Sequence, residues 1–161
     1  MPTFPNARYL FSKAEYAHWE SEAGEAEAAQ GHSGAVDDCF ADSVLPVMEA
    51  GLVTFVDDGH SVDDQMSIES SAGHTPGHIS LNLDGGDRHA VFSGDLMHHP
   101  VQVAYPEWNS RFCVDPKMSR ATREAFVERH RDTDTTILAA HFAAPTAGRI
   151  VSNGTRAKFQ V

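Results

Sequence analysis

Alternating hydrophobic and polar residues mark the middle of the chain as rich in β-structure. Ile79–Leu83 alternates at period two, Asp84–Asp87 has the composition of a tight turn, and His89–Ser93 returns, which predicts a β-hairpin. Leu52–Val56 and Met66–Glu69 are two further predicted strands, because each is a short apolar or alternating run beside turn residues. This part of the chain is therefore predicted to be mostly β-structure.

Helical signals precede and follow this region. Ser12 and Glu15 form a capping box, and Asp115 before Pro116 has the pattern of an N-cap and a first helical residue. Gly51 is a stop signal for a third helix. The predicted helices cover residues 13–19, 43–50 and 116 to about 131.

Further strands are predicted toward both ends, and one segment lacks large apolar residues. Residues 8–11 and 136–140 are predicted strands, and Asn153-Gly154 indicates a second hairpin over 149–161. The Ala-, Gly- and Glu-rich stretch 20–38 is predicted to be an acidic, mobile insertion. This order of elements indicates an α/β or α+β fold in which helices pack on a mixed sheet.

Composition argues against several classes of function. The 161 residues fit one domain, and 12 Lys+Arg against 23 Asp+Glu give a net charge of −11, which disfavours nucleic-acid binding. No apolar run reaches the roughly 18 residues of a membrane span, so no membrane partner is expected. Cys39 and Cys113 lack disulfide-framework or metal-cluster spacing and indicate free thiols in the cytoplasm. The ten scattered histidines favour a metal or acid–base site.

Three segments place a metal-binding side chain just after a predicted strand. They are GHTPGH at 73–78, FSGD at 92–95 and AAHF at 139–142. Taken singly, each is more often a turn, a cap or a core histidine. Two histidines and one aspartate at strand ends are, however, a plausible zinc shell.

In this order and context the three segments resemble the C-terminal half of the metallo-β-lactamase superfamily. Residues 4–19, and the stretch from Asp95 to Arg149, resemble the branch that contains methyl parathion hydrolase and the N-acyl-homoserine lactonases. The resemblance implies a single partial domain over 1–161: half of an αββα sandwich, with a mixed or antiparallel sheet and helices on one face.

The family's upstream signature, H-x-H-x-D-H, is absent. Since it supplies four ligands of a two-metal site, the chain is expected to be half of a protein: a fragment, a truncated reading frame or one part of a split enzyme. The complete family site holds two zinc ions, and this chain alone is expected to hold one or none. Manganese, iron or cobalt are also possible at a His/Asp site.

The resemblance assigns a role to each candidate residue. It implies that Asp95 bridges the two metals as a catalytic ligand, and that His74 and His141 each complete one metal shell. His98 is the position from which relatives contact the substrate, so it is the second catalytic candidate. His78 is expected to support the ligands without binding metal.

A long loop supplies the candidate substrate pocket. Tyr105, Trp108 and Phe112 either line that pocket or pack the loop onto the domain. Both interpretations stay open at the level of the sequence.

The expected function is that of a metal-dependent hydrolase that cleaves an ester, lactone or organophosphate by means of a metal-bound hydroxide. The alternative is an inactive remnant or a partner-binding module that keeps an incomplete metal site. Alone, the chain is expected to be inactive or strongly impaired. Its partners are a small-molecule substrate and either a missing N-terminal half or a second copy. The homodimer is expected to cover an apolar sheet face that includes Ile79, Leu81, Leu83, Val91 and Ile137.

Overall fold

The computed structural model of the chain describes residues 1–28 and 40–161. These residues divide into two compact units, Met1–Asp57 and Asp58–Val161. No helix among them is both long and apolar enough to cross a membrane.

The first unit combines a small parallel sheet with helices. Strand β1 (Tyr9–Ser12) pairs in parallel with β2 (Val53–Val56), and α1 (Lys13–Ala28) follows β1 directly. The backbone N–H of Glu15 donates to Ser12 Oγ over 3.4 Å, as the capping box predicts.

Helix α1 continues past its predicted end at residue 19. Residues 20–28 belong to the predicted insertion, yet they are rich in Glu and Ala, which have high helix propensity and extend the helix. The remainder of the predicted insertion lies outside the described residues. A further helical region begins as a π-helix, η1 (Phe40–Val44), continues as α3 (Leu45–Glu49) and ends before Gly51, whose φ is +67°.

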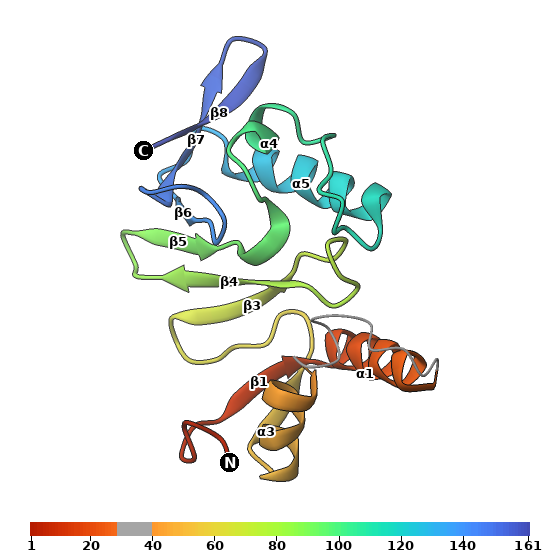
Figure 1. Cartoon of the computed structure of the whole chain (residues 1–161). Coiled ribbons are helices and arrows are strands. Elements are labelled where there is room, and N and C mark those ends of the chain that lie inside the picture. The colour runs from red at the N-terminus through yellow and green to blue at the C-terminus, as the bar shows by residue number, and fades with distance from the viewer. Residues whose placement is uncertain (29–39) are drawn as a thin grey trace. The chain divides into compact units, whose positions relative to one another are not determined.

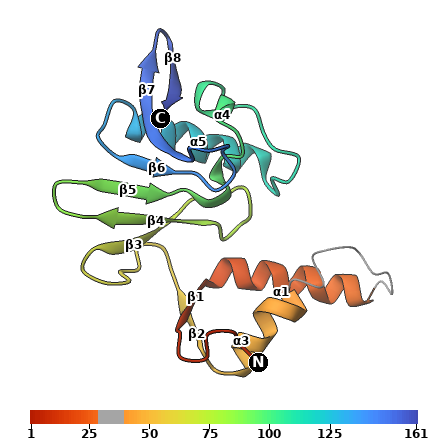
Figure 2. The ribbon, with the colours of Figure 1, turned by 60° about the vertical axis from the view of Figure 1, so that its left-hand side comes forward.

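The second unit contains a six-stranded mixed sheet (Figures 1 and 2). Its strands lie side by side in chain order, and only the β5–β6 pair is parallel. The strands are β3 (Met66–Ser70), β4 (Ile79–Asp84), β5 (His89–Phe92), β6 (Thr136–Leu138), β7 (Ala147–Asn153) and β8 (Arg156–Gln160). Both predicted hairpins, β4–β5 and β7–β8, are present.

Three helical segments belong to this unit: η2 (Gly94–Leu96), α4 (Val101–Ala104) and α5 (Pro116–His130). Helix α5 begins where the sequence predicts, and Asp115 accepts a hydrogen bond from the backbone N–H of Met118. Phe126 and Val127 of α5 belong to the same buried core cluster as Val91, Ile137 and Ile150 of the sheet. The sheet therefore has one face covered by α5.

The strand register corrects the expected apolar face. Val91 lies opposite Asn82, between the pairs of Leu81 and Leu83, and Ile137 lies beside Val91. Because successive side chains of a strand point to opposite faces, Val91 and Ile137 point toward α5, and they are 3% and 0% exposed. Leu81 and Leu83 point to the other face with Ile79, and these three residues are only half-buried.

Candidate metal centre

The three motif segments meet around Asp95. Its Oδ2 lies 3.5 Å from His74 Nε2, and its Oδ1 lies 2.8 Å from His141 Nε2. Asp95 belongs to η2 just after β5, His74 to the loop between β3 and β4, and His141 to the loop after β6. The expected convergence of these side chains is observed, and their role as metal ligands stays a prediction.

His98 also belongs to this cluster. One ligand atom each of His74, Asp95 and His98 lie within 4.8 Å of one another, close enough to share a metal ion. The His98 ring stacks on that of His141, with centroids 4.7 Å apart, and lies 4.9 Å from that of His74. The sequence indicated a substrate-contacting histidine here; the structure places it among the potential metal donors.

The chemistry of these side chains fits a metal ion. The Nδ1 atoms of His74 and His98 are buried and have no hydrogen-bond partner among the described residues, although buried polar atoms are normally paired. Burial, followed by the nearby His74 and His141, lowers the pKa of His98 and favours its neutral, metal-binding form. The side chain of His74 is 13% exposed and that of His141 is 47% exposed, so the cluster opens to solvent on the His141 side.

His78 holds the backbone of Asp95 from behind. Its Nε2 accepts a hydrogen bond from the Asp95 N–H over 2.9 Å, so the ring proton of the neutral side chain must be on Nδ1. His78 Nδ1 lies 2.7 Å from Ser71 Oγ, which is 2.9 Å from Ser80 Oγ. The two serines are each 4% exposed. A chain of hydrogen bonds therefore runs from the Asp95 backbone through His78 to the two buried serines. That His78 supports the ligands without binding metal stays a prediction.

Two glycines of the motifs permit close packing. A Cβ on Gly94, at φ +52°, would lie 2.7 Å from His78 Nε2. A Cβ on Gly73, at φ +132°, would lie 2.2 Å from the backbone nitrogen of Ser119 in α5. Both glycines have a positive φ, which side chains disfavour, and both lie so close to a neighbouring group that there is no room for a Cβ. Gly73 thereby lets the His74 loop rest on the start of α5.

Arg123, a residue that sequence reasoning missed, organises the loop that carries His98. Its side chain is 0% exposed, and its guanidinium donates to the carbonyl groups of Leu96 and Pro106, to Ser119 Oγ and to Asn109 Oδ1. Burial lowers the pKa of Arg123, which stays charged at neutral pH. An arginine in an amphipathic helix normally faces water, so no local pattern could have identified it.

The candidate pocket residues lie on the same loop. Tyr105 stacks on Trp108 with ring centroids 4.7 Å apart, and the Arg156 guanidinium lies 4.0 Å from the Tyr105 ring centroid. Trp108 and Phe112 are 54% and 61% exposed. These contacts fit the loop-packing interpretation for Tyr105, and a substrate contact by any of the three stays a prediction.

Comparison with known proteins identifies the fold. No family model and no curated protein matches the sequence. Among solved structures, the hydrolase AbOPH of the β-lactamase superfamily superposes with a TM-score of 0.82 at 27% identity, over 97% of this chain and 55% of AbOPH. AidC, a dizinc quorum-quenching lactonase, gives a TM-score of 0.80 at 20% identity over 99% of this chain and 56% of AidC. An N-acyl homoserine lactone hydrolase gives 0.59 at 16% identity, over 88% of this chain and 50% of that enzyme.

The chain has the fold of a segment of a metallo-β-lactamase superfamily hydrolase, which confirms the resemblance carried by the three motifs. It spans about half the length of these solved structures.

Proposed function

We propose that this chain forms part of the active site of a metal-dependent hydrolase that cleaves an ester, lactone or organophosphate. The observation that carries the proposal is the convergence of His74, Asp95, His98 and His141 at strand ends of this fold. The likeness to AbOPH and to lactonases supports hydrolysis as the reaction class and a small molecule as the substrate. A cytoplasmic location is part of the proposal.

The cluster offers donors on both sides of Asp95. The less exposed His74 lies beside Oδ2 and the more exposed His141 contacts Oδ1, and His98 lies within reach of both His74 and Asp95. We assign His74, Asp95 and His98 to one ion, with His141 adjacent. Zinc suits imidazole and carboxylate donors, and manganese, iron or cobalt would suit them also. A bound ion would supply Lewis acidity and an activated water.

The proposal includes a strongly reduced activity for the 161 residues by themselves. The described cluster has enough donors for one ion, and a second ion contributes several kcal/mol of charge stabilisation, where each 1.36 kcal/mol is about tenfold in rate. We therefore expect hydrolysis at least roughly a thousandfold slower than that of a complete relative.

Complementation tests the proposal. The chain is assayed with zinc on a lactone, a p-nitrophenyl ester and a phosphotriester, with and without a separately expressed segment carrying H-x-H-x-D-H. We expect the segment to restore activity and Asp95→Ala to abolish it. Asp64→Ala, at an exposed loop position, is the matched control. Robust hydrolysis by the chain alone that survives Asp95→Ala would contradict the proposal.

A partner-binding module that keeps an incomplete metal site is the second candidate function. The uncovered sheet face favours it, because Ile79, Leu81 and Leu83 are half-buried and Phe92 is 44% exposed. A second copy of the chain is the proposed partner. Light scattering at tens of micromolar is expected to give a dimer mass, and Phe92→Ser is expected to shift it to a monomer. A monomer mass for the unsubstituted chain would contradict the proposed homodimer.

A further inference from the structure

Gln102, in α4, is a buried amide outside the cluster of candidate metal donors. It is 5% exposed and lies between His98 and Trp108 in the chain. Within the described residues its side chain makes three hydrogen bonds, and all three go to backbone groups of the segments on either side of it. The amide of Gln102 therefore connects two segments of the loop to each other.

The carbonyl oxygen of this amide holds the backbone of His98. Gln102 Oε1 accepts a hydrogen bond from the His98 N–H over 2.6 Å and one from the His99 N–H over 3.2 Å. An amide oxygen has two lone pairs, so these two donors use its whole capacity as an acceptor. The buried Nδ1 of the His98 ring, by contrast, has no hydrogen-bond partner among the described residues. The hydrogen bond that holds His98 is therefore on its backbone.

The amino group of the same side chain holds the other segment. Gln102 Nε2 donates to the carbonyl of Trp108 over 2.7 Å. The opposite orientation of the amide would turn an N–H group toward two N–H donors and an oxygen toward a carbonyl, so the partners determine the orientation. One planar amide therefore joins the His98 backbone to the Trp108 backbone.

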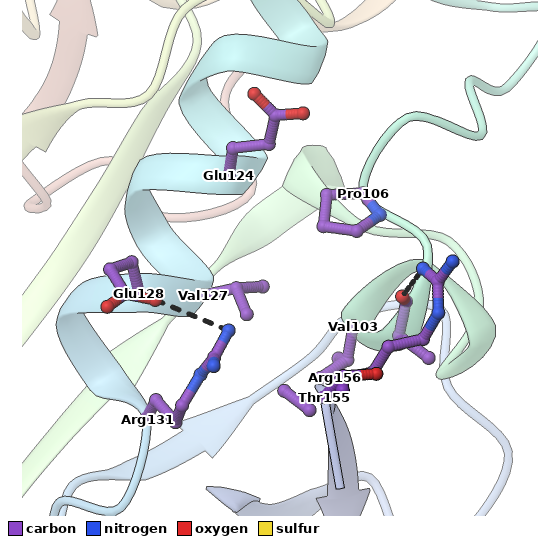
Figure 3. Close-up of a pocket in the computed structure, with 10 residues that line it drawn as sticks. Val103, Pro106, Glu124, Val127, Glu128, Arg131, Thr155 and Arg156 are labelled. Carbon is purple, nitrogen blue, oxygen red and sulfur yellow. Dashed lines mark hydrogen bonds and ion pairs between the residues drawn. The ribbon is translucent and has the colours of Figure 1, made fainter. Parts of the chain in front are cut away.

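The residues between Gln102 and Trp108 are anchored to other elements. Three of them line a cavity of about 380 Å³ whose other walls come from the second half of α5 and the residue after it, and from the β7–β8 hairpin (Figure 3): Val103, Ala104 and Pro106. The Ala104 carbonyl accepts a hydrogen bond from Arg156 over 2.8 Å, and the Pro106 carbonyl accepts one from Arg123 over 2.9 Å. The anchors of this stretch to α5 and β8 therefore do not involve the Gln102 amide.

We propose that Gln102 is a positioning residue of the metal centre, which fixes the backbone of His98 and couples it to the Trp108 segment. The inference rests on the proposed function, because it takes His98 as a metal donor. Gln102 acts through His98 and does not itself bind the ion. Groups that orient metal ligands through hydrogen bonds typically change metal affinity 10- to 100-fold when they are removed.

Zinc binding to the full chain, measured by competition with a chromophoric chelator, tests the proposal. Gln102→Met has a side chain of similar length without an amide, and we expect it to weaken zinc at least about tenfold. Gln102→Glu keeps an acceptor oxygen for the His98 N–H and removes the donor to Trp108, so it is expected to retain at least about a third of the affinity. Gln65→Met, the same substitution at an exposed loop position, is the matched control and should leave the affinity unchanged.

A further control separates the role of the amide from general loosening of the loop. Arg156→Gln removes the hydrogen bond to the Ala104 carbonyl and leaves the acceptor of the His98 N–H in place. We expect this variant to bind zinc within about threefold of the unsubstituted chain. An equal loss of affinity in folded Arg156→Gln and Gln102→Met would overturn a specific role for Gln102.

Amide hydrogen exchange of the metal-free protein tests the positioning without any ion. We expect the His98 and His99 amides to be protected in the unsubstituted chain, and to exchange at least about tenfold faster in Gln102→Met. In Gln102→Glu, the His98 amide should keep its protection while the Trp108 amide exchanges faster. Circular dichroism establishes that each variant is folded.

The outcomes distinguish this inference from the proposed function. If the unsubstituted chain binds no zinc, the proposed function fails, and the exchange rates alone then decide whether Gln102 fixes His98. An unprotected His98 amide in the unsubstituted chain overturns the inference without the need for any variant. Unchanged zinc affinity in folded Gln102→Met, or an equal loss in folded Gln102→Glu, overturns it as well.

Discussion

The two sides of Asp95 are built differently. Behind it, His78 Nε2 accepts a hydrogen bond from the Asp95 backbone N–H, and His78 Nδ1 contacts the buried Ser71, which contacts the buried Ser80. In front of it, its 42%-exposed carboxylate meets imidazoles whose contacts depend on protonation or on a bound metal. The position of the Asp95 backbone is therefore fixed by the fold, whereas the arrangement of the donors depends on what they bind.

The largest expected effect comes from a substitution that prevents the His74 loop from packing on α5. Gly73→Ala would place a Cβ 2.2 Å from the Ser119 backbone nitrogen at a φ of +132°, so the His74 loop has to leave α5. We expect a loss of about 3 kcal/mol or more in the free energy of unfolding, measured by urea denaturation. Gly86→Ala also has a positive φ but meets nothing within 4 Å, so it should cost about 1 kcal/mol. Equal losses in the two variants would mean that close packing at Gly73 is unimportant.

The next effect is on zinc affinity, and it distinguishes the proposed metal donors from an adjacent histidine. We expect His98→Ala to weaken zinc binding at least about 100-fold, comparable to His74→Ala, because both rings belong to one donor group. His99→Ala is the adjacent control and should change the zinc dissociation constant less than about threefold. Competition with a chromophoric chelator measures all three. If His98→Ala retains the affinity and loses only hydrolysis, the substrate-contacting role implied by the sequence is the correct one.

A smaller effect tests whether the hydrogen bonds behind Asp95 influence metal binding in front of it. Ser71→Ala removes the hydroxyl that contacts both His78 Nδ1 and Ser80 Oγ, and leaves His78 Nδ1 only its longer contact of 3.2 Å with the Ser71 carbonyl. We expect zinc affinity to fall about tenfold and the free energy of unfolding by about 1–2 kcal/mol. Ser67→Ala, on neighbouring β3, should leave zinc affinity unchanged. Loss of stability without loss of affinity would show that the two sides of Asp95 act independently.

The smallest expected effect is on the pH dependence of the free energy of unfolding, and it comes from a histidine outside the Asp95 cluster. His130, in α5, is 8% exposed. Burial lowers its pKa, the nearby charge of Arg129 lowers it further, and Glu69 acts in the opposite direction. The unfolded chain therefore takes up a proton more readily, so stability is full above about pH 6.5 and falls as pH decreases through that value. His130→Phe should flatten the stability profile between about pH 7.5 and 5.5 in metal-free protein. An unchanged profile would contradict the assignment of this pH dependence to His130.

Local patterns in the sequence determined much of the fold and most of the site. The β4–β5 hairpin, the Asp115 N-cap and the stop at Gly51 depend on residues that are close together in the chain, so alternation and capping rules identified them. The three motifs indicated His74, Asp95 and His141 because each follows a strand, and strand ends gather ligands in sheet folds.

Only the tertiary structure decided how these pieces face one another. Val91 and Leu81 are both apolar residues of neighbouring strands, but the strand register points Val91 toward α5 and Leu81 to the opposite face. His98 joins the donors, and Arg123 is buried, because segments distant in sequence fold against one another there. The cavity beside α5 likewise arises from three separate segments. Such contacts depend on packing between elements, for which a single sequence has no local signal.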